Sequence, residues 1–419
     1  MVGASGAERL PVSDERLAER TEERRVVLRT LALRDFRNLA RLDLTIPAAG
    51  VVVVGENGQG KSNLLEAIYY LHLLRSVRGA RDVDVVRFGA PGFHIAARAI
   101  GGVHHELSAG FERQGKRKRV KLGGAEPQRL SDALGALPCV LFSPADVELV
   151  AGAPSARRRY LDILLALSSR PYLAALQRYR HALAQRNAAL RDAFRQGGNK
   201  AEQRIAVWEA PLAEHGAVLW RARVEWSDLA APRFAAICAA IGEQSPVAMR
   251  YATALEPSAH EHAAVRSALT EGLEQRRGLD VRRGLTHTGP HRDDLVLTLD
   301  GRELRAFGSA GQQRTGAIAL RLLEGETLRE RLGAAPLLLL DDPFAELDVR
   351  RSGRILELLA EHGMGQTVLT VPRESDIPPA LTQLARWRIV AGEIGIAHPG
   401  DATQDTLPGG VRQADGRDE

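Results

Sequence analysis

The spacing of apolar positions predicts a β-rich first part, a long helical middle and a last part in which strands and helices alternate. Up to Phe142, apolar residues recur at every second position or in short β-branched runs, which is typical of strands. The expected strands are Val26–Leu33, Leu42–Ile46, Val51–Val54, Phe93–Ala99, His105–Phe111, Arg119–Leu122 and Val140–Phe142. The run Val51–Val54 indicates a buried parallel strand, and an apolar helix is expected after it at Asn63–Leu74.

From Ser155 the apolar positions follow a helical period, which breaks at Gly197-Gly198 and resumes to about Ile241. Strand-like alternation returns at Leu295–Leu299, where Asp300-Gly301 predicts a hairpin turn. The remaining expected elements are a helix after Ser309, the strand Leu337–Leu340, the helix Arg351–Glu361 and the strand Thr367–Val371. This order predicts an α/β nucleotide-binding lobe with an inserted α-helical lobe.

The predicted lobes have definite boundaries. Residues 26–153 and 282–397 would form a discontinuous head, and residues 154–281 a helical arm inserted between them. The segments 1–25 and 398–419 are polar and charged, and we expect them to be disordered tails. A length of 419 residues agrees with more than one core.

The composition is that of a soluble protein, with 44% hydrophobic and 26% charged residues. No apolar run approaches the roughly 18 residues of a membrane span, and the N-terminal residues are charged where a signal peptide would be apolar. The two cysteines, Cys139 and Cys238, form no disulfide framework and have no metal-ligand spacing. We therefore expect a cytoplasmic protein without a membrane partner.

The positive charge is concentrated in one segment. The chain carries a net charge of +5, whereas Pro154 to Lys200 contains nine arginines and one lysine against two aspartates, a net +8. A basic segment on a slightly acidic body favours local contact with a polyanion, and a solvated helix face is the alternative.

The octapeptide GENGQGKS fits the phosphate-loop pattern G-x-x-x-x-G-K-[ST] and lies between an expected strand and an expected helix. Its glycines allow the backbone N–H groups to turn toward a phosphate, and its lysine and serine supply a cation and a Mg²⁺ ligand. The predicted ATP-binding residues are Gly55, Glu56, Asn57, Gly58, Gln59, Gly60, Lys61 and Ser62.

The stretch LLLLDDPFAELD is the expected acidic partner of this loop. Four leucines indicate a buried strand that would bring Asp341 and Asp342 beside the phosphates. We predict that Asp341 holds Mg²⁺ together with Ser62, and that Asp342 orients the attacking water. Lys61 and Asp342 are thus the expected catalytic residues.

A second anion site is expected in FGSAGQQR, because small residues here precede an apolar helix whose first N–H groups are free. The stretch resembles the ABC-type signature, in which a Ser-x-Gly-Gln motif binds the γ-phosphate held by another subunit. It also lies about 30 residues before the acidic strand, as that class requires. By this resemblance Ser309, Gly311 and Gln312 would contact ATP of a partner chain.

Four further blocks are similar to the RecF family of bacterial recombination-mediator ATPases. They are LRDFRNLARL, SVRGARDVDVVRFGA, FSPADVELVAGAPSARRRYLD and THTGPHRDDL, and the resemblance runs from about Leu28 to Val371. It implies an SMC/Rad50-like ABC-ATPase head with a short helical arm. It also implies ATP-dependent homodimerisation on single-stranded and gapped duplex DNA, weak DNA-stimulated hydrolysis, recombinase loading with RecO and RecR, and support of the SOS response.

The strand after the acidic motif departs from the transporter pattern. Transporters carry a histidine there, whereas this chain has QTVLTVPRESD, in which Thr370 is the nearest polar candidate for a γ-phosphate sensor.

Three groups of polar residues leave two interpretations open. Arg157, Arg158 and Arg159 could contact DNA or the other lobe, or the last two could pair with Asp162 along the helix. The hairpin residues could contact DNA or protect a sheet edge, and the histidine-rich loop could hold a metal or form a hydrogen-bonded corner. The hairpin group is Lys116, Arg117, Lys118, Arg119 and Lys121, and the loop group is His287, His291, Asp293 and Asp294.

Three functions are compatible with these motifs: a DNA-binding dimeric ATPase, the motor subunit of a membrane transporter, and a DNA scaffold that uses ATP only as a structural ligand. The missing histidine, the short arm and the +8 segment disfavour the transporter.

Overall fold

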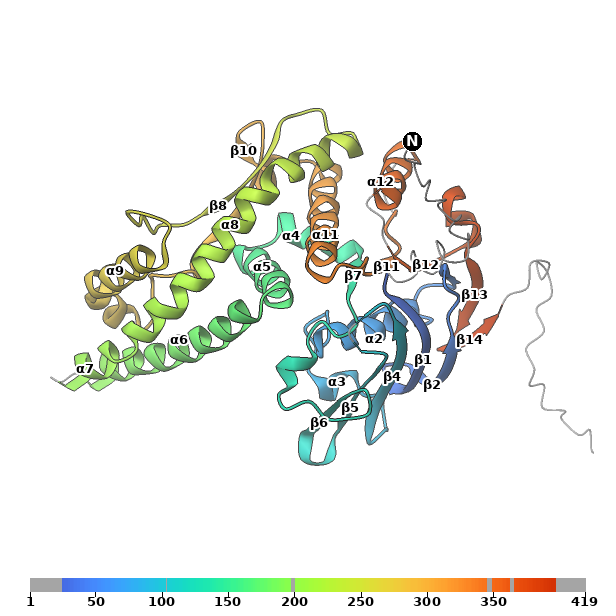
Figure 1. The fold of residues 1–419 in the computed structure, drawn as a ribbon, viewed down its shortest axis with the longest axis horizontal. Helices are drawn as coiled ribbons and strands as arrows, with labels where there is room; N and C mark the ends of the chain where they lie inside the picture. Colours follow the sequence, from blue (N-terminus) through green and yellow to red (C-terminus); the bar gives the residue numbers. More distant parts are fainter. Residues whose placement is uncertain (1–24, 103, 197–199, 345–348, 362–364, 397–419) are drawn as a thin grey trace, which may run out of the picture.

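The computed structural model describes residues 25–102, 104–196, 200–344, 349–361 and 365–396. The expected disordered tails lie outside the described residues, except for Arg25. The head contains two sheets, and a helical arm extends from it (Figure 1). No helix among the described residues has the length and apolar character needed to cross a bilayer.

The first sheet of the head is antiparallel and has the strand order β2-β1-β4-β5-β6. Its strands are β1 (Val27–Phe36), β2 (Leu39–Thr45), β4 (Gly92–Ile100), β5 (Glu106–Glu112) and β6 (Arg117–Leu122). Burial alternates along β4 and β5, because one face of each strand packs on the core and the other faces solvent.

The second sheet has the order β14-β13-β3-β12-β11-β7, and all its pairs are parallel except β13 with β14. Its strands are β3 (Gly50–Val54), β7 (Cys139–Phe142), β11 (Leu337–Asp341), β12 (Thr367–Val371), β13 (Ala385–Val390) and β14 (Glu393–Ile396). The phosphate-loop strand β3 is thus separated from the acidic strand β11 by β12 alone.

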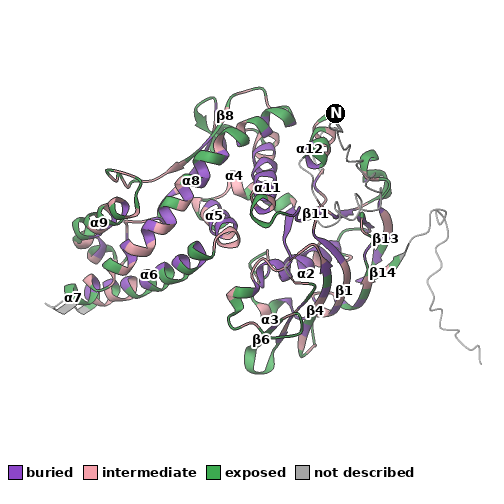
Figure 2. Ribbon diagram, in the orientation of Figure 1, coloured by how far each residue is buried: buried purple, intermediate pink, exposed green. Residues whose placement is uncertain are grey.

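The short apolar runs of β3 and β11 arise because both faces of these strands are buried. Val52 belongs to a core shared with the base of the arm, whereas Val51 and Val53 belong to the core around α2 (Lys61–Leu73) and the first sheet. Alternate leucines of β11 divide between the same two cores. Figure 2 shows buried residues through α2 and exposed ones over the β5–β6 hairpin.

The arm consists of long helices that pack on one another. They are α5 (Pro154–Ser168), α6 (Arg170–Gln196), α7 (Lys200–Ala206), α8 (Glu209–Ile241) and α9 (His262–Arg283). Two polar networks fix the arm internally. The fully buried Arg186 bonds Asp280 and Glu209 at 2.7 and 3.0 Å, and Arg223 bonds Asp162 at 2.7 Å.

A small sheet of order β10-β9-β8 also belongs to the arm side of the molecule. It comprises β8 (Val247–Ala252), β9 (Asp294–Leu299) and β10 (Arg302–Glu303), and the expected hairpin turn at Asp300-Gly301 joins the last two. Because β8 pairs with β9, the boundary expected at 281/282 separates two strands of one sheet.

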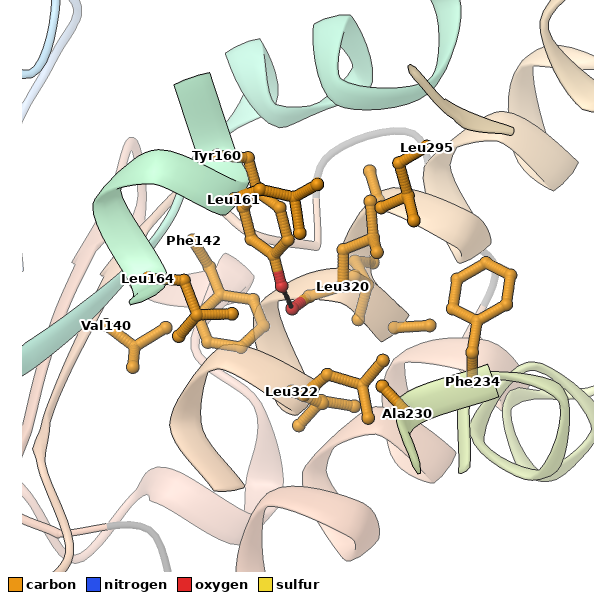
Figure 3. Close-up of a cluster of buried hydrophobic side chains, with 14 of the residues drawn as sticks. Val140, Phe142, Tyr160, Leu161, Leu164, Ala230, Phe234, Leu295, Leu320 and Leu322 are labelled. Carbon is orange, nitrogen blue, oxygen red and sulfur yellow. Dashed lines mark hydrogen bonds between the residues drawn. The ribbon is translucent and has the colours of Figure 1, made fainter. Parts of the chain in front are cut away.

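The chain returns to the head through α10 (Leu304–Phe307) and α11 (Ala310–Leu332). Figure 3 shows the apolar cluster where α5 of the arm, α8 and α11 meet. The hydroxyl of Tyr160 on α5 donates to the carbonyl of Leu320 in the middle of α11 at 2.7 Å. The base of the arm and the helix that follows the signature stretch are therefore packed as one unit.

Three further short helices are α3 (Asp82–Val85), α4 (Glu148–Ala151) and α12 (Val349–Glu361). The sequence did not predict α9 or the strands β8, β13 and β14. The other strands, apart from β10, for which no bounds were predicted, begin and end within three residues of the expected positions.

Candidate nucleotide-binding site

The GENGQGKS loop connects β3 to the first turn of α2, as expected. Gly58 and Gly60 have φ values of 83° and 116°, which a residue with a side chain rarely adopts. A Cβ atom at Gly60 would lie 2.9 Å from the amide of Asn38, and one at Gly55 would lie 2.5 Å from the carbonyl oxygen of Ile389. No side chain caps the start of α2. Its first N–H groups therefore fit an anion such as a phosphate.

Lys61 lies at the first position of α2, and its side chain folds back over the loop. Its Nζ donates to the carbonyl oxygens of Gly55 and, at 2.9 Å, of Glu56. Burial lowers the pKa of Lys61, and the nearby Asp341 and Asp342 act in the opposite direction. The ammonium group is thus held at the loop by two carbonyl oxygens, and the two carboxylates stabilise its charge from nearby.

Ser62, Asp341 and Thr370 converge at the carboxyl edge of the parallel sheet. Asp341 pairs with Thr370, and Thr370 with Val53 of the strand that leads into the loop. Both hydroxyls donate to Asp341 Oδ1, from Ser62 at 2.9 Å and from Thr370 at 2.8 Å. A serine hydroxyl beside a carboxylate provides the hard oxygen donors that Mg²⁺ prefers, so these residues fit the ion.

Asp342 has a left-handed backbone conformation, with φ of 46°, and its N–H donates to the carbonyl of Thr370 at 3.0 Å. Its pKa is raised mainly by burial, and the charges of Asp341 and Asp376 raise it further. The half-buried carboxylate next to the Mg²⁺ candidate is a group that can orient a water molecule.

Arg37 and Asn38 form the turn between β1 and β2, called the FRN turn below. They support the phosphate loop and the helix after it, a role that the sequence resemblance did not assign. The Asn38 amide donates to the Gln59 carbonyl at 3.1 Å and accepts from the Asn63 amide at 2.8 Å. Arg37 donates two hydrogen bonds, of 3.0 and 3.1 Å, to the buried Glu66 of α2. The sequence signal that could have indicated this role is a short polar turn between two strands.

The β13–β14 turn supports the loop from the other side. The side-chain oxygen of Gln59 accepts from the N–H of Ala391 at 2.6 Å, and its carbonyl accepts from Gly392 at 2.9 Å. The β13–β14 turn therefore holds Gln59 in place, and through Gln59 it helps to set the conformation of the phosphate loop.

The SAGQQ stretch starts α11, and Ser309 is its N-cap. Ser309 Oγ accepts from the N–H of Gln312 at 3.3 Å, while the Gln312 side chain accepts from the N–H of Ser309 at 2.9 Å. This reciprocal capping box presents the helix start in a fixed geometry. A Cβ atom at Gly311 would lie 2.9 Å from the guanidinium of Arg351, so the glycine permits a close approach by α12.

A direct bond joins the signature helix to the acidic motif. Arg314, in the first turns of α11, donates to the carbonyl of Pro343 at 3.0 Å. Because Pro343 directly follows Asp342, the position of the carboxylate depends on the position of α11.

Arg157 forms a contact to the other expected lobe, the alternative to a DNA contact at this position. Its buried guanidinium forms two hydrogen bonds to Asp294 at 2.9 and 2.8 Å, and it also donates to the carbonyls of Val150 and Gly152. This side chain joins the arm's first helix to β9 and is turned away from solvent. The alternative i+3 and i+4 pairs with Asp162 do not form, because Asp162 bonds Arg180 and Arg223.

The neighbouring arginines differ from Arg157. Arg158 donates to the backbone carbonyl of Asp293 at 2.8 Å, and Arg159 is exposed. In the hairpin, Lys116 and Arg117 are exposed, whereas Lys118 is held by Asp82 at 2.8 Å and by the carbonyl of Leu74 at 2.6 Å. Arg158, Arg159, Lys116 and Arg117 remain candidates for a nucleic-acid interface, and Lys118 is engaged within the head.

The histidine-rich loop forms a hydrogen-bonded corner. His291 lies 3.0 Å from the Thr286 carbonyl through Nε2 and 2.6 Å from the Tyr179 hydroxyl through Nδ1. Burial lowers its pKa to about 4, so the neutral ring can donate to the first and accept from the second. His287, Asp293 and Asp294 bond to Asp280, Tyr251 and Arg157, respectively. Among the described residues, no group of three or more metal-ligating side chains is present.

Comparisons with known proteins agree with this geometry. A family model of the RecF/RecN/SMC N terminal domain matches residues 27–384. The DNA replication and repair protein RecF of Frankia alni is 39% identical over 373 residues, covering 87% of this chain and 98% of the relative. That of Chloroflexus aurantiacus is 38% identical over 390 residues, with coverage of 87% and 98%.

Solved structures give the same result. The fold is similar to that of the recombination mediator protein RecF-ATP in RecFOR pathway, with a TM-score of 0.80, 28% identity, and coverage of 89% of this chain and 98% of that one. An Smc head domain from Pyrococcus furiosus shares the fold at a TM-score of 0.51 and 16% identity, with coverage of 89% and 96%. The ABC-ATPase head predicted from the sequence is therefore confirmed, and the chain belongs to the RecF family.

Proposed function

We propose that this chain is a weak, DNA-stimulated ATPase of recombinational repair and replication that binds DNA as an ATP-dependent dimer. The observation that carries the proposal is the convergence of Ser62, Asp341 and Thr370 beside an uncapped helix start. The RecF names of the relatives, and the RecF-ATP structure among the neighbours, support the same function.

Each residue of the site has a separate task in this proposal. The loop N–H groups and the Lys61 ammonium bind the phosphate oxygens, and Ser62 and Asp341 would hold Mg²⁺. When bound, that ion neutralises charge that develops on the phosphates during transfer. Asp342 orients the attacking water, while Thr370 fixes the carboxylate of Asp341 from a buried position.

The second copy of the chain supplies the remaining contacts. Ser309 and Gln312 are engaged in their own helix cap, and neither bonds to the phosphate loop among the described residues. Ser309 and Ala310 are exposed, and a helix start that faces solvent in this way can receive a phosphate from outside the chain. We infer that each site combines one copy's loop with the other copy's Ser309, Gly311 and Gln312.

The test is a multiple-turnover phosphate-release assay with purified protein, Mg²⁺-ATP and either no DNA, single-stranded DNA or a gapped duplex. The proposal expects slow turnover that DNA accelerates, together with a dimer detected by light scattering only when ATP is present. Tight ATP and DNA binding without turnover would favour the structural-ligand scaffold instead.

The partners follow from the family. The structural neighbour acts in the RecFOR pathway, and we propose that RecO and RecR act with this chain in recombinase loading and SOS induction. Co-purification of the chain with RecR in the presence of ATP and DNA, and its loss without ATP, would test the first contact.

A further inference from the structure

A cleft of about 470 Å³ lies where the end of α2 meets the arm helices α5 and α6. Its walls come from five segments: the turn after α2, the first turns of α5, the middle of α6, the middle of α8, and the loop that contains His291. Five arginines and one carboxylate line it, and the lining arginines are Arg75, Arg158, Arg159, Arg180 and Arg223. The cleft is outside the nucleotide site, because no residue of the phosphate loop or the signature stretch lines it.

The one carboxylate of the cleft offsets only part of this positive charge. Asp162 already accepts from Arg223, Arg180 and the Tyr172 hydroxyl, at 2.7, 2.8 and 2.7 Å. Arg223 is buried and fully engaged with protein groups, so it contributes structure rather than a free cation. The charge of Asp162 is therefore already paired within the arm.

Two cationic groups in the cleft have no protein partner. Arg75 and Arg159 make no hydrogen bond or ion pair with any described residue, and both are exposed, as is Arg180. Partial loss of the water around the Arg75 guanidinium lowers its pKa, and the charges of Arg159 and Arg180 lower it further. The guanidinium groups of Arg75, Arg159 and Arg180 thus gather at one place, and only Arg180 has a carboxylate partner, so an anion bound there would be stabilised.

We propose that this cleft binds a phosphate group of a nucleic-acid strand, which thereby contacts the head and the arm together. The proposal rests on the DNA binding proposed above and locates one of its contacts. Guanidinium groups match phosphate oxygens in pairs of parallel hydrogen bonds, and several arginines around one anion are typical of phosphate recognition. Because the three arginines are exposed, the bound group can remain part of a strand that continues outside the cleft.

The experiment measures the affinity for a fluorescently labelled gapped duplex over a series of KCl concentrations, with saturating ATP. The cleft variant carries Arg75→Gln, Arg159→Gln and Arg180→Gln. The control variant carries Arg81→Gln, Arg178→Gln and Arg195→Gln, which removes the same charge from exposed arginines that do not line the cleft. Loss of Arg180 leaves Asp162 paired with Arg223, so the cleft variant is expected to fold, and Arg159→Gln alone provides a milder version.

The slope of log affinity against log salt concentration should be less steep for the cleft variant. The expected change is about 0.9 for each lost contact with a duplex phosphate, or about 0.7 for each lost contact with a single-strand phosphate. The control variant should keep the slope of the parent. A parent protein that binds no DNA would contradict the proposed function. If the parent binds DNA with the same salt slope as the cleft variant, the cleft proposal alone would be wrong. The same holds if the salt slope becomes less steep by the same amount in the cleft variant and the control variant.

A second measurement distinguishes a strand from a free anion. Inorganic phosphate is titrated into ATP-saturated protein at constant ionic strength, and thermal stability is recorded. Phosphate should stabilise the parent weakly and the cleft variant less. If this difference appeared while the DNA salt slopes stayed equal, the ligand would be a free phosphate and the strand proposal would be wrong.

Discussion

Thr370 donates a 2.8 Å hydrogen bond to Asp341 from a fully buried position on the neighbouring strand. The residue considered as a γ-phosphate sensor is therefore in direct contact with the candidate Mg²⁺ ligand. Thr370→Val keeps the shape but removes this bond to a charged group, which is worth about 1.5–3 kcal/mol. We expect the Mg²⁺ concentration for half-maximal ATPase activity to rise about 10- to 100-fold.

Thr367→Val is the matched control, because Thr367 lies on the same strand and its side chain makes no bond to the site. Phosphate release over a Mg²⁺ titration separates the two variants. Equal Mg²⁺ dependence in both would show that Thr370 does not position Asp341.

Asp342→Asn should retain ATP binding and dimerisation but reduce hydrolysis at least about a hundredfold, since the group that orients the water loses its charge. Asp341→Asn should differ by weakening Mg²⁺ binding. Nucleotide titration and phosphate release on both variants provide the measurement. Hydrolysis at the parent rate in Asp342→Asn would place the catalytic carboxylate elsewhere in the acidic motif.

The same Asp342→Asn variant should be more heat-stable than the parent at alkaline pH. The pKa of Asp342 is raised in the folded state from its ordinary value of 3.8, so its ionisation lowers stability progressively as the pH rises from 3.8 through the raised value. The difference should shrink as the pH falls and vanish below 3.8, where the folded and unfolded parent are both protonated. Melting temperatures of both proteins across pH test this. A difference that grows toward acid pH would contradict it.

Ser309→Asp should block ATP-driven dimerisation while leaving ATP binding by the monomer unchanged. Asp caps helices as well as Ser does, so α11 keeps its N-cap, but the added carboxylate would repel the partner's γ-phosphate. Ser309→Asn is the neutral control with nearly the same shape. Light scattering with ATP should show a dimer for Asn and a monomer for Asp; dimers in both would exclude Ser309 from the shared site.

Asn38→Asp should weaken ATP binding without unfolding the head. The substitution replaces the amide that donates to the Gln59 carbonyl with a carboxylate that repels it, and the loop would lose its support from the FRN turn. The loss of one such bond in a partly buried site is expected to cost about 1–3 kcal/mol, or roughly 5- to 150-fold in affinity. Nucleotide titration and a melting curve would measure both effects. Unchanged affinity would show that the loop holds its shape without Asn38.

Arg157→Gln should destabilise the protein, because it leaves the partly buried Asp294 without its cation; removal of one partner from a buried pair costs about 3–5 kcal/mol. Arg159→Gln, two residues away and exposed, should have little effect on melting. Equal melting temperatures would contradict the structural role given to Arg157.

The sequence predicted the parts of the head whose signals are local. The phosphate loop has a specific glycine pattern, and β3 and β11 are short apolar runs typical of buried strands. These signals agree with one another. In contrast, α9 was missed because its mean composition is polar and only Val265, Leu269 and Leu273 form its buried stripe. β13 was missed because arginines alternate with its buried Trp387 and Ile389.

The ion pairs could not be derived from spacing. Asp162 has arginines at helical distance, yet it bonds Arg180 and Arg223 on two other helices, because the low dielectric between packed helices rewards full pairing of a buried carboxylate. For the same reason the pattern could not distinguish Arg157 from Arg159. Which face of α5 meets β9 is decided by tertiary packing.

The place of β3 between β12 and β13 has a consequence for the order in which the protein is made. The ribosome releases the phosphate-loop strand early, whereas both strands that pair with it lie beyond residue 366. Until they emerge, an almost wholly apolar strand has two unpaired edges, the condition that promotes aggregation of nascent chains. The arm helices, whose contacts are closer in sequence, can form sooner. A chain interrupted before Thr367 would therefore lack a nucleotide site and would depend on chaperones to stay in solution.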